Sequence, residues 1–234
     1  MTRHELKEQL QHDHFTDAVS GAVIYARSHR ESLTRWIIVA GIVLLVAGGA
    51  FWFMAYRNSV RQQDLENAFV ILDAPVGAPS QLGKTFATQD AKNQASMKAL
   101  QDVIAKDGGT GQGLIAQYYL GTLKASTHDT KGAEADLENV ANSSSECAPL
   151  AKIALAQIYS SENRTADAQR LLRDIVNKPT DLVSKAQAQI LLAHLEEATN
   201  PQEAKKLLQE AKTGSQDPAV ARAVSEVSSQ LNNR

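Results

Sequence analysis

Cysteine and aromatic residues are scarce in this sequence. Its 234 residues include a single cysteine, Cys147, and aromatic residues make up 5% of the chain. One cysteine excludes an intramolecular disulfide framework and a metal site built from several thiolates. The chain is rich in Ala, Leu, Gln and Ser, a composition that favours helices over sheets.

The sequence also lacks an excess of either charge. It carries 24 basic and 26 acidic side chains, for a formal net charge of -2, and its isoelectric point is about 6.3. Nucleic-acid-binding domains instead concentrate positive charge on one face. We therefore expect no nucleic acid among the partners.

Catalytic motifs are missing as well. The sequence contains no HExxH, no Walker loop and no GxGxxG. The candidate nucleophile and bases of the region after the apolar run, Cys147, His128 and His194, lie in different predicted repeats without an activating motif. A helix N-terminus near Cys147 could lower its thiol pKa, but we interpret this residue as structural. We expect a non-enzymatic protein without a catalytic site, cofactor or metal, and keep a membrane-bound hydrolase using Cys147 as a minor alternative.

One long apolar run is present, WIIVAGIVLLVAGGAFWFMAY at residues 36–56. As a helix its 21 residues would measure roughly 31 Å, about the thickness of the bilayer hydrocarbon. Trp36 lies at one edge and four aromatic residues gather at the other, the pattern of interfacial belts. A cleaved signal peptide is the alternative, but 35 residues precede the run and it exceeds the usual signal core. We interpret it as an uncleaved transmembrane helix.

Basic residues near the two ends of this run indicate its orientation. Three arginines (Arg27, Arg30, Arg35) precede it closely and two (Arg57, Arg61) follow it. The positive-inside rule then favours a cytoplasmic N-terminus and a translocated C-terminal part. We predict a cytoplasmic tail over 1–35, a transmembrane helix over 36–56 and a repeat domain over 57–234.

The residues after Tyr56 predict further helices. The segment 57–72 continues the membrane helix, and the prolines and glycines of 73–84 break it. A helix over about 90–106 ends at Gly108 and Gly109. Asn200-Pro201 and Asp217-Pro218 each combine an N-cap with a proline in the first turn, and the second pair opens a last helix over roughly 218–231.

An internal repeat decides the expected fold. YYLGTLKASTHDTKGAEADLENVA aligns with ALAQIYSSENRTADAQRLLRDIV, so that small and apolar residues recur 35 positions apart. A third copy, ILLAHLEEATNPQEAKKLLQEA, follows at offsets of 37 and then 36. Small residues in the first helix (Gly121, Ala156, Ala193) would face small residues in the second (Ala133, Ala168, Ala204). Antiparallel helices can then approach closely, while Leu and Ile fill the seams between hairpins.

These copies resemble tetratricopeptide repeats, whose period is about 34 residues. The pieces LGTLK, LAQIY and LAHLE, each followed by the later Ala and Leu, carry the resemblance over about 114–213. The usual early Trp is absent, the third copy is shortened, and the first copy lacks a clear first helix. Ser96, Leu100 and Val103 could belong to a degenerate earlier hairpin. We expect an all-α chain: an N-terminal tail, one transmembrane helix and a tetratricopeptide-like solenoid of helical hairpins.

The layout as a whole resembles the YfgM-like family of membrane-anchored tetratricopeptide-repeat proteins. FTDAVSGAVIYARSHRESL, the anchor from Trp36 and the repeats after Gly113 carry this resemblance. It implies association with the Sec translocon and with periplasmic chaperones. It supplies no catalytic motif whose residues could be carried over.

A peptide- or partner-binding groove is expected on the concave face, which the first helices line. Counted from the aligned leucines, the predicted groove residues are Tyr118, Thr122, Gln157, Ser160, His194 and Glu197. Such a stripe of hydroxyls and amides around Tyr118, Ile153 and Ile190 suits an extended peptide or a helix, although the same residues could be ordinary solvated positions.

Two functions follow from these observations. The first is a protein-protein interaction scaffold or holdase in the bacterial inner membrane, with its C-terminal domain in the periplasm, ancillary to protein translocation and to chaperones. The alternative is a cytoplasm-facing tetratricopeptide adaptor that recruits a soluble complex to the membrane. Both have protein partners and contact the lipid bilayer through one helix.

Overall fold

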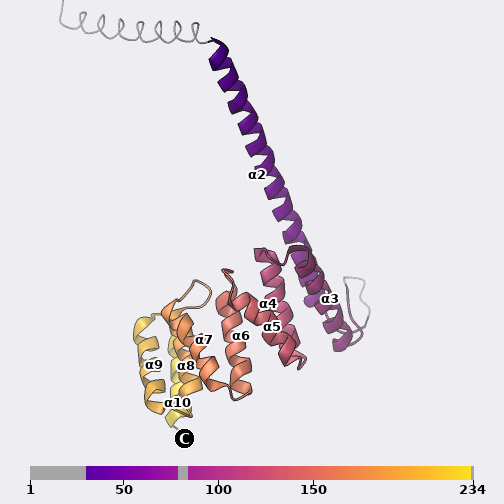
Figure 1. Ribbon diagram of the computed structural model, residues 1–234. Helices are drawn as coiled ribbons and strands as arrows, with labels where there is room; N and C mark the ends of the chain where they lie inside the picture. The colour runs from indigo at the N-terminus through magenta and orange to yellow at the C-terminus, as the bar shows by residue number, and fades with distance from the viewer. Residues whose placement is uncertain (1–29, 79–83, 233–234) are drawn as a thin grey trace, which may run out of the picture. The chain divides into compact units, whose positions relative to one another are not determined.

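A computed structural model describes residues 30–78 and 84–232 (Figure 1). The regular elements of these ranges are the helices α2 (Arg30–Leu72), α3 (Gln89–Asp107), α4 (Gly111–Ser126), α5 (Thr130–Ala141), α6 (Ala148–Ser161), α7 (Thr165–Asn177), α8 (Lys185–Glu196), α9 (Pro201–Gly214) and α10 (Pro218–Asn232). The predicted all-α class is confirmed. Most of the predicted tail, residues 1–29, lies outside the described residues, as do residues 79–83 of the predicted break.

The chain divides into two compact units, residues 1–59 and 60–234. Helix α2 continues through this boundary, as expected from the polar helix formers after Tyr56. In the first unit the apolar side chains of α2 have no protein cover: Leu45 is 78% exposed and Phe51 76% exposed. By length and composition this is the one helix in the described part of the chain suited to cross a membrane.

The second unit begins with a hairpin formed by the end of α2 and by α3. Leu65 and Ala68 of α2 pack with Leu100 and Val103 of α3 in one buried cluster. Ion pairs join the same two helices, Arg61 to Asp107 at 2.9 Å and Lys106 to Asp64 at 3.0 Å. The earlier degenerate hairpin considered from the sequence is therefore present, with α2 as its first helix.

Three further hairpins follow, α4 with α5, α6 with α7 and α8 with α9, and α10 packs against α8 and α9. From α3 onward each helix contacts the next along the chain, so the hairpins stack in sequence order (Figure 1). The predicted solenoid of hairpins is confirmed. The expectation that the first copy lacks a clear first helix was wrong. Helix α4 fills that place, beginning directly after the glycines at 108–109 with Thr110 as its N-cap.

The turns inside the α4–α5 and α6–α7 hairpins have the same backbone geometry. His128 and Asn163, 35 residues apart, both adopt the left-handed conformation, with φ of 66° and 62°. In each turn the following amide donates to a carbonyl five residues earlier, from Asp129 to Lys124 at 2.9 Å and from Arg164 to Tyr159 at 2.7 Å. The repeat is therefore structural as well as sequential. The turn between α8 and α9 differs, since Asn200 there has φ of -145° and ψ of 73° and caps α9.

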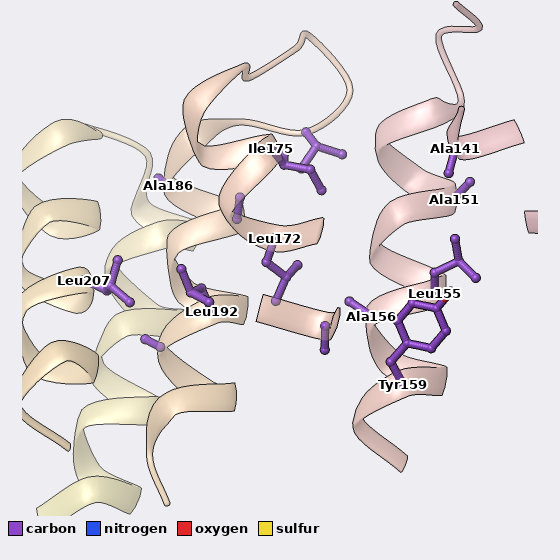
Figure 2. Packing of buried hydrophobic residues seen from close by; sticks show 14 of the residues in the cluster. Ala141, Ala151, Leu155, Ala156, Tyr159, Leu172, Ile175, Ala186, Leu192 and Leu207 are labelled. Carbon is purple, nitrogen blue, oxygen red and sulfur yellow. The ribbon is translucent and has the colours of Figure 1, made fainter. Parts of the chain in front are cut away.

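Close packing inside the hairpins follows the small residues. A Cβ atom on Gly121 would lie 2.7 Å from Cγ of Leu137 and 3.4 Å from the carbonyl oxygen of Ala133, so only glycine fits the present spacing. The alanines at the equivalent places, Ala156, Ala168, Ala193 and Ala204, are all buried. Figure 2 shows Leu172 of α7 between Ala156 on α6 and Leu192 on α8. One continuous core thus runs from α5 to α10.

The predicted caps are present. The Asn200 side chain accepts the amide proton of Glu203 at 3.3 Å, and the Asp217 carboxylate accepts that of Ala219 at 2.8 Å. These bonds satisfy backbone donors that have no partner inside their helices. They fix where α9 and α10 begin and so help to set the position of the last helix against the stack.

Candidate binding groove

A groove of about 480 Å³ lies across α6, α7 and α8. Its apolar lining comes from Ile153, Ala156, Leu172, Leu191 and Leu195. Its polar lining consists of Gln157, Ser160, Ser161 and His194. The volume falls within the range of about 300–1,000 Å³ that is usual for binding pockets.

Helical periodicity explains how this lining is assembled. Ile153, Gln157 and Ser160 are spaced by four and three residues, so they share one face of α6. Leu191, His194 and Leu195 share a face of α8 by the same rule. Helix α7 lies between these helices in the chain and contacts both. Its Leu172 therefore completes the apolar lining of the groove.

Three of the six predicted groove residues line this groove: Gln157, Ser160 and His194. The first two are exposed on α6. His194 is also exposed and holds its Nδ1 atom 3.2 Å from Oε1 of Glu197. The structure therefore brings together the predicted polar residues of the second and third repeats.

Glu197 has a different environment from the one predicted. It lies at the C-cap of α8 and its side chain is 4% exposed, beneath His194. A carboxylate at the C-terminal end of a helix is disfavoured by the helix dipole, and the imidazole of His194 lies within hydrogen-bonding distance of it. Glu197 orients His194 from below and does not line the groove.

Tyr118 and Thr122 lie on α4, away from this groove. Tyr118 is half-buried, its ring 5.4 Å from that of Tyr119 in an edge contact, and burial raises the pKa of its hydroxyl. Thr122 donates its hydroxyl proton to the carbonyl oxygen of Tyr119 at 2.9 Å. The predicted stripe is therefore divided between α4 and the groove over α6 to α8.

Sequence reasoning missed five of the lining residues: Ala156, Ser161, Leu172, Leu191 and Leu195. Leu191 and Leu195 are four positions apart, a signal that was available. Ile190, which the same reasoning placed in the stripe, packs against the core and is not among the lining residues. Neighbouring residues point in different directions around a helix, so Leu191 lines the groove whereas Ile190 does not.

The lining suits an uncharged polypeptide. Leu191, Leu195 and Ile153 offer apolar surface to nonpolar side chains. Gln157 carries both donors and acceptors, as do serine hydroxyls, so these groups can bond to either the amide or the carbonyl of a peptide. Apart from His194, the groove has no ionisable side chain among its lining residues.

Cys147 has no features of an activated nucleophile. It occupies the N-cap of α6, where its side chain makes no capping bond, and it is half-buried. Burial raises the pKa of its thiol, and a bond to Ser145 offsets this only in part. Nucleophilic cysteines have lowered pKa values. Among residues 30–78 and 84–232, no cluster of three or more His, Cys, Asp or Glu side chains could hold a metal.

Comparison with known proteins places this architecture among described repeat domains. Residues 33–180 match the family model described as a tetratricopeptide repeat-like domain. The chain is similar to a crystal structure of nearly identical TPR-like repeats from a Podosopora anserina protein assigned as a kinesin light chain, at 18% identity and a TM-score of 0.49, covering 74% of this chain and 93% of that one. A variant of that protein with one residue replaced gives the same identity and TM-score over 92% of its length. No curated protein is significantly similar to the chain.

Proposed function

We propose, from the premise that the chain belongs to the tetratricopeptide repeat-like domain family, that it is a membrane-anchored scaffold whose groove over α6 to α8 holds a polypeptide segment. Domains of this family typically serve as non-catalytic scaffolds for protein interaction. The observation that carries the proposal is the groove lining itself, in which Gln157 and Ser160 border an apolar floor.

The occupant we propose is a neutral, largely apolar segment in extended conformation. Apolar side chains would cover Ile153, Leu191 and Leu195, while the backbone would bond to the amide and hydroxyls at the rim. Because backbone groups are common to all sequences, such a groove tolerates many segments. That tolerance is what a holdase for unfolded clients requires.

The anchor in this proposal is the apolar part of α2. Its residues from Trp36 to Tyr56 are uncharged, and the large apolar side chains described there, such as Leu45 and Phe51, are exposed. The helix continues to Leu72. Continuation into a polar helix that packs against α3 favours an uncleaved anchor over a signal sequence. Anchoring raises the local concentration of the domain for clients at the same membrane.

The proposed location is the bacterial inner membrane, with a cytoplasmic N-terminus and the repeat domain in the periplasm. The arginine asymmetry around residues 36–56 supports this orientation. The resemblance to the YfgM-like family supports a role ancillary to the Sec translocon and to periplasmic chaperones. A periplasmic reporter fused after Arg234 should be active and a cytoplasmic one inactive; the reverse result would favour a cytoplasm-facing adaptor.

Groove occupancy can be tested on the full chain in lipid nanodiscs. The probe is a fluorescent, uncharged peptide of alternating Leu and Ser. Gln157→Arg with Ser160→Arg should raise its Kd by roughly tenfold, because two guanidinium groups would be placed against an apolar ligand. The control, Asn139→Arg with Gln202→Arg, adds the same charge at exposed sites outside the groove. Equal Kd values for both variants would reject the assignment.

A further inference from the structure

A second groove, of about 420 Å³, lies at the C-terminal end of the stack between α9 and α10. Its floor is formed by Leu208 and Val224, which are buried in the core, and Lys205 and Lys212 stand on its α9 side. The two lysines are seven residues apart, two turns of helix, and so lie about 10.5 Å from one another along one face. This groove shares no lining residue with the one over α6 to α8.

The charge of this groove is positive. The acidic residues of α9 are engaged elsewhere, Glu203 with Lys206 at 3.8 Å and Glu210 with Gln189 at 2.8 Å. No carboxylate belongs to the described lining. A complementary occupant therefore carries two negative charges about 10 Å apart with an apolar group between them.

The end of α2 has this pattern. Glu66 and Asp73 are also seven residues apart, with Phe69 and Val70 between them, and all four line a hollow of about 560 Å³. Val70 is 62% exposed. The amide of Asp73 donates to the carbonyl of Phe69 at 2.8 Å, so the helical geometry extends to the second carboxylate. Lys84, over the ring of Phe86 at 5.7 Å, also borders the hollow.

The two surfaces belong to opposite ends of one stack. Helices α3 to α8 separate them in an unbroken series of contacts (Figure 1). They cannot meet within one molecule, but they can meet between two. A contact of this kind is heterologous, head to tail, and leaves one end free on each outer copy.

We propose that the groove between α9 and α10 receives the end of α2 of a second copy of this chain. In an antiparallel arrangement, which also aligns the helix dipoles favourably, Glu66 lies opposite Lys212 and Asp73 opposite Lys205. Val70 then lies in the groove beside Ala221, an exposed lining residue. The inference goes beyond the proposed polypeptide groove, which stays open in such an assembly.

Charge reversal tests this contact on the full chain in detergent, by sedimentation velocity. The unaltered chain should self-associate, and raising salt from about 0.05 M to about 0.5 M should weaken the association because exposed ion pairs are screened. Lys205→Glu with Lys212→Glu, or Glu66→Lys with Asp73→Lys, should each weaken it by about tenfold. Lys185→Glu with Lys131→Glu changes the net charge equally at exposed sites outside the groove and should have no effect.

Mixing the two charge-reversed proteins is the decisive step. Each mutated surface then finds its complement on the other protein, so the mixture should regain the association of the unaltered chain. A mixture that stays monomeric, or an unaltered chain that is monomeric throughout, would overturn the proposal. So would unchanged self-association of the Lys205→Glu, Lys212→Glu variant together with lost affinity for phosphatidylglycerol micelles, since the groove would then hold lipid headgroups.

Discussion

The hydroxyl of Tyr159 donates a hydrogen bond to Oε1 of Glu138 at 2.8 Å, which joins the second repeat hairpin to the first. The Arg164 guanidinium lies 3.9 Å above the centre of the same ring and pairs with Glu134 at 2.8 Å. Tyr159 is 3% exposed. These contacts tie the turn after α6 to the helix α5 of the preceding repeat.

We expect Tyr159→Phe to reduce the free energy of unfolding by about 1 kcal/mol, because it removes this bond and retains the ring. The change should leave helicity unaltered. Chemical unfolding followed by circular dichroism measures the difference. Tyr119→Phe, whose ring is more exposed, is the control; an equal loss in both variants would contradict the account.

The difference in unfolding free energy between the unaltered protein and Tyr159→Phe should shrink at alkaline pH. Burial, followed by the bond to Glu138, raises the pKa of the Tyr159 hydroxyl in the folded protein, whereas an unfolded tyrosine titrates near 10. The unfolded chain then binds fewer protons above pH 10, so this contribution is complete below pH 10 and is lost as pH rises beyond it. Unfolding measured at about pH 8 and pH 11 should show the two proteins converging. A constant gap would contradict the assignment.

Gly121→Leu should destabilise the repeat domain by roughly 2 to 3 kcal/mol, because the space beyond Gly121 is filled by Leu137 and Ala133. Gly111→Leu is the matched control, since a Cβ atom there meets no atom within 4 Å. Thermal unfolding of both variants compares them directly. Similar midpoints would mean that α4 and α5 are not closely packed.

Much of this packing was accessible from the sequence. The offset of 35 residues located Gly121, Ala156 and their partners because close helix contacts require small side chains at fixed intervals. The two left-handed turn residues, His128 and Asn163, are also 35 residues apart. Neither histidine nor asparagine by itself predicts that conformation. A strict repeat thus predicts local geometry that single residues do not.

The candidate site was less predictable, for reasons visible in particular residues. Glu197 was expected in the groove by counting from the aligned leucines, yet its side chain is buried beside His194. Ile190 and Leu191 are adjacent and equally apolar, so the sequence did not decide which of them faces the groove. The packing of α8 against its neighbouring helices, which the sequence does not display, determines which of its residues are exposed.

A double-mutant cycle should show that His194 and Glu197 act together. His194→Ala leaves a buried carboxylate without its neighbour at 3.2 Å and should cost about 1 to 3 kcal/mol. Glu197→Gln, which retains an acceptor oxygen, should cost less. Unfolding free energies of the two single variants and the double variant give the coupling, expected to be about 1 kcal/mol. Strict additivity would show that the pair is not coupled.

The most direct test of the proposed function is site-specific photocrosslinking of the full chain in native membranes. A photoreactive side chain at Gln157 should form adducts with polypeptides, and Ser160→Arg in the same chain should abolish them. The same side chain at Asn139, exposed on α5 and outside the groove, should form few. Equal adducts at both positions, or adducts at Gln157 that persist with Ser160→Arg, would contradict the claim that this groove holds the partner.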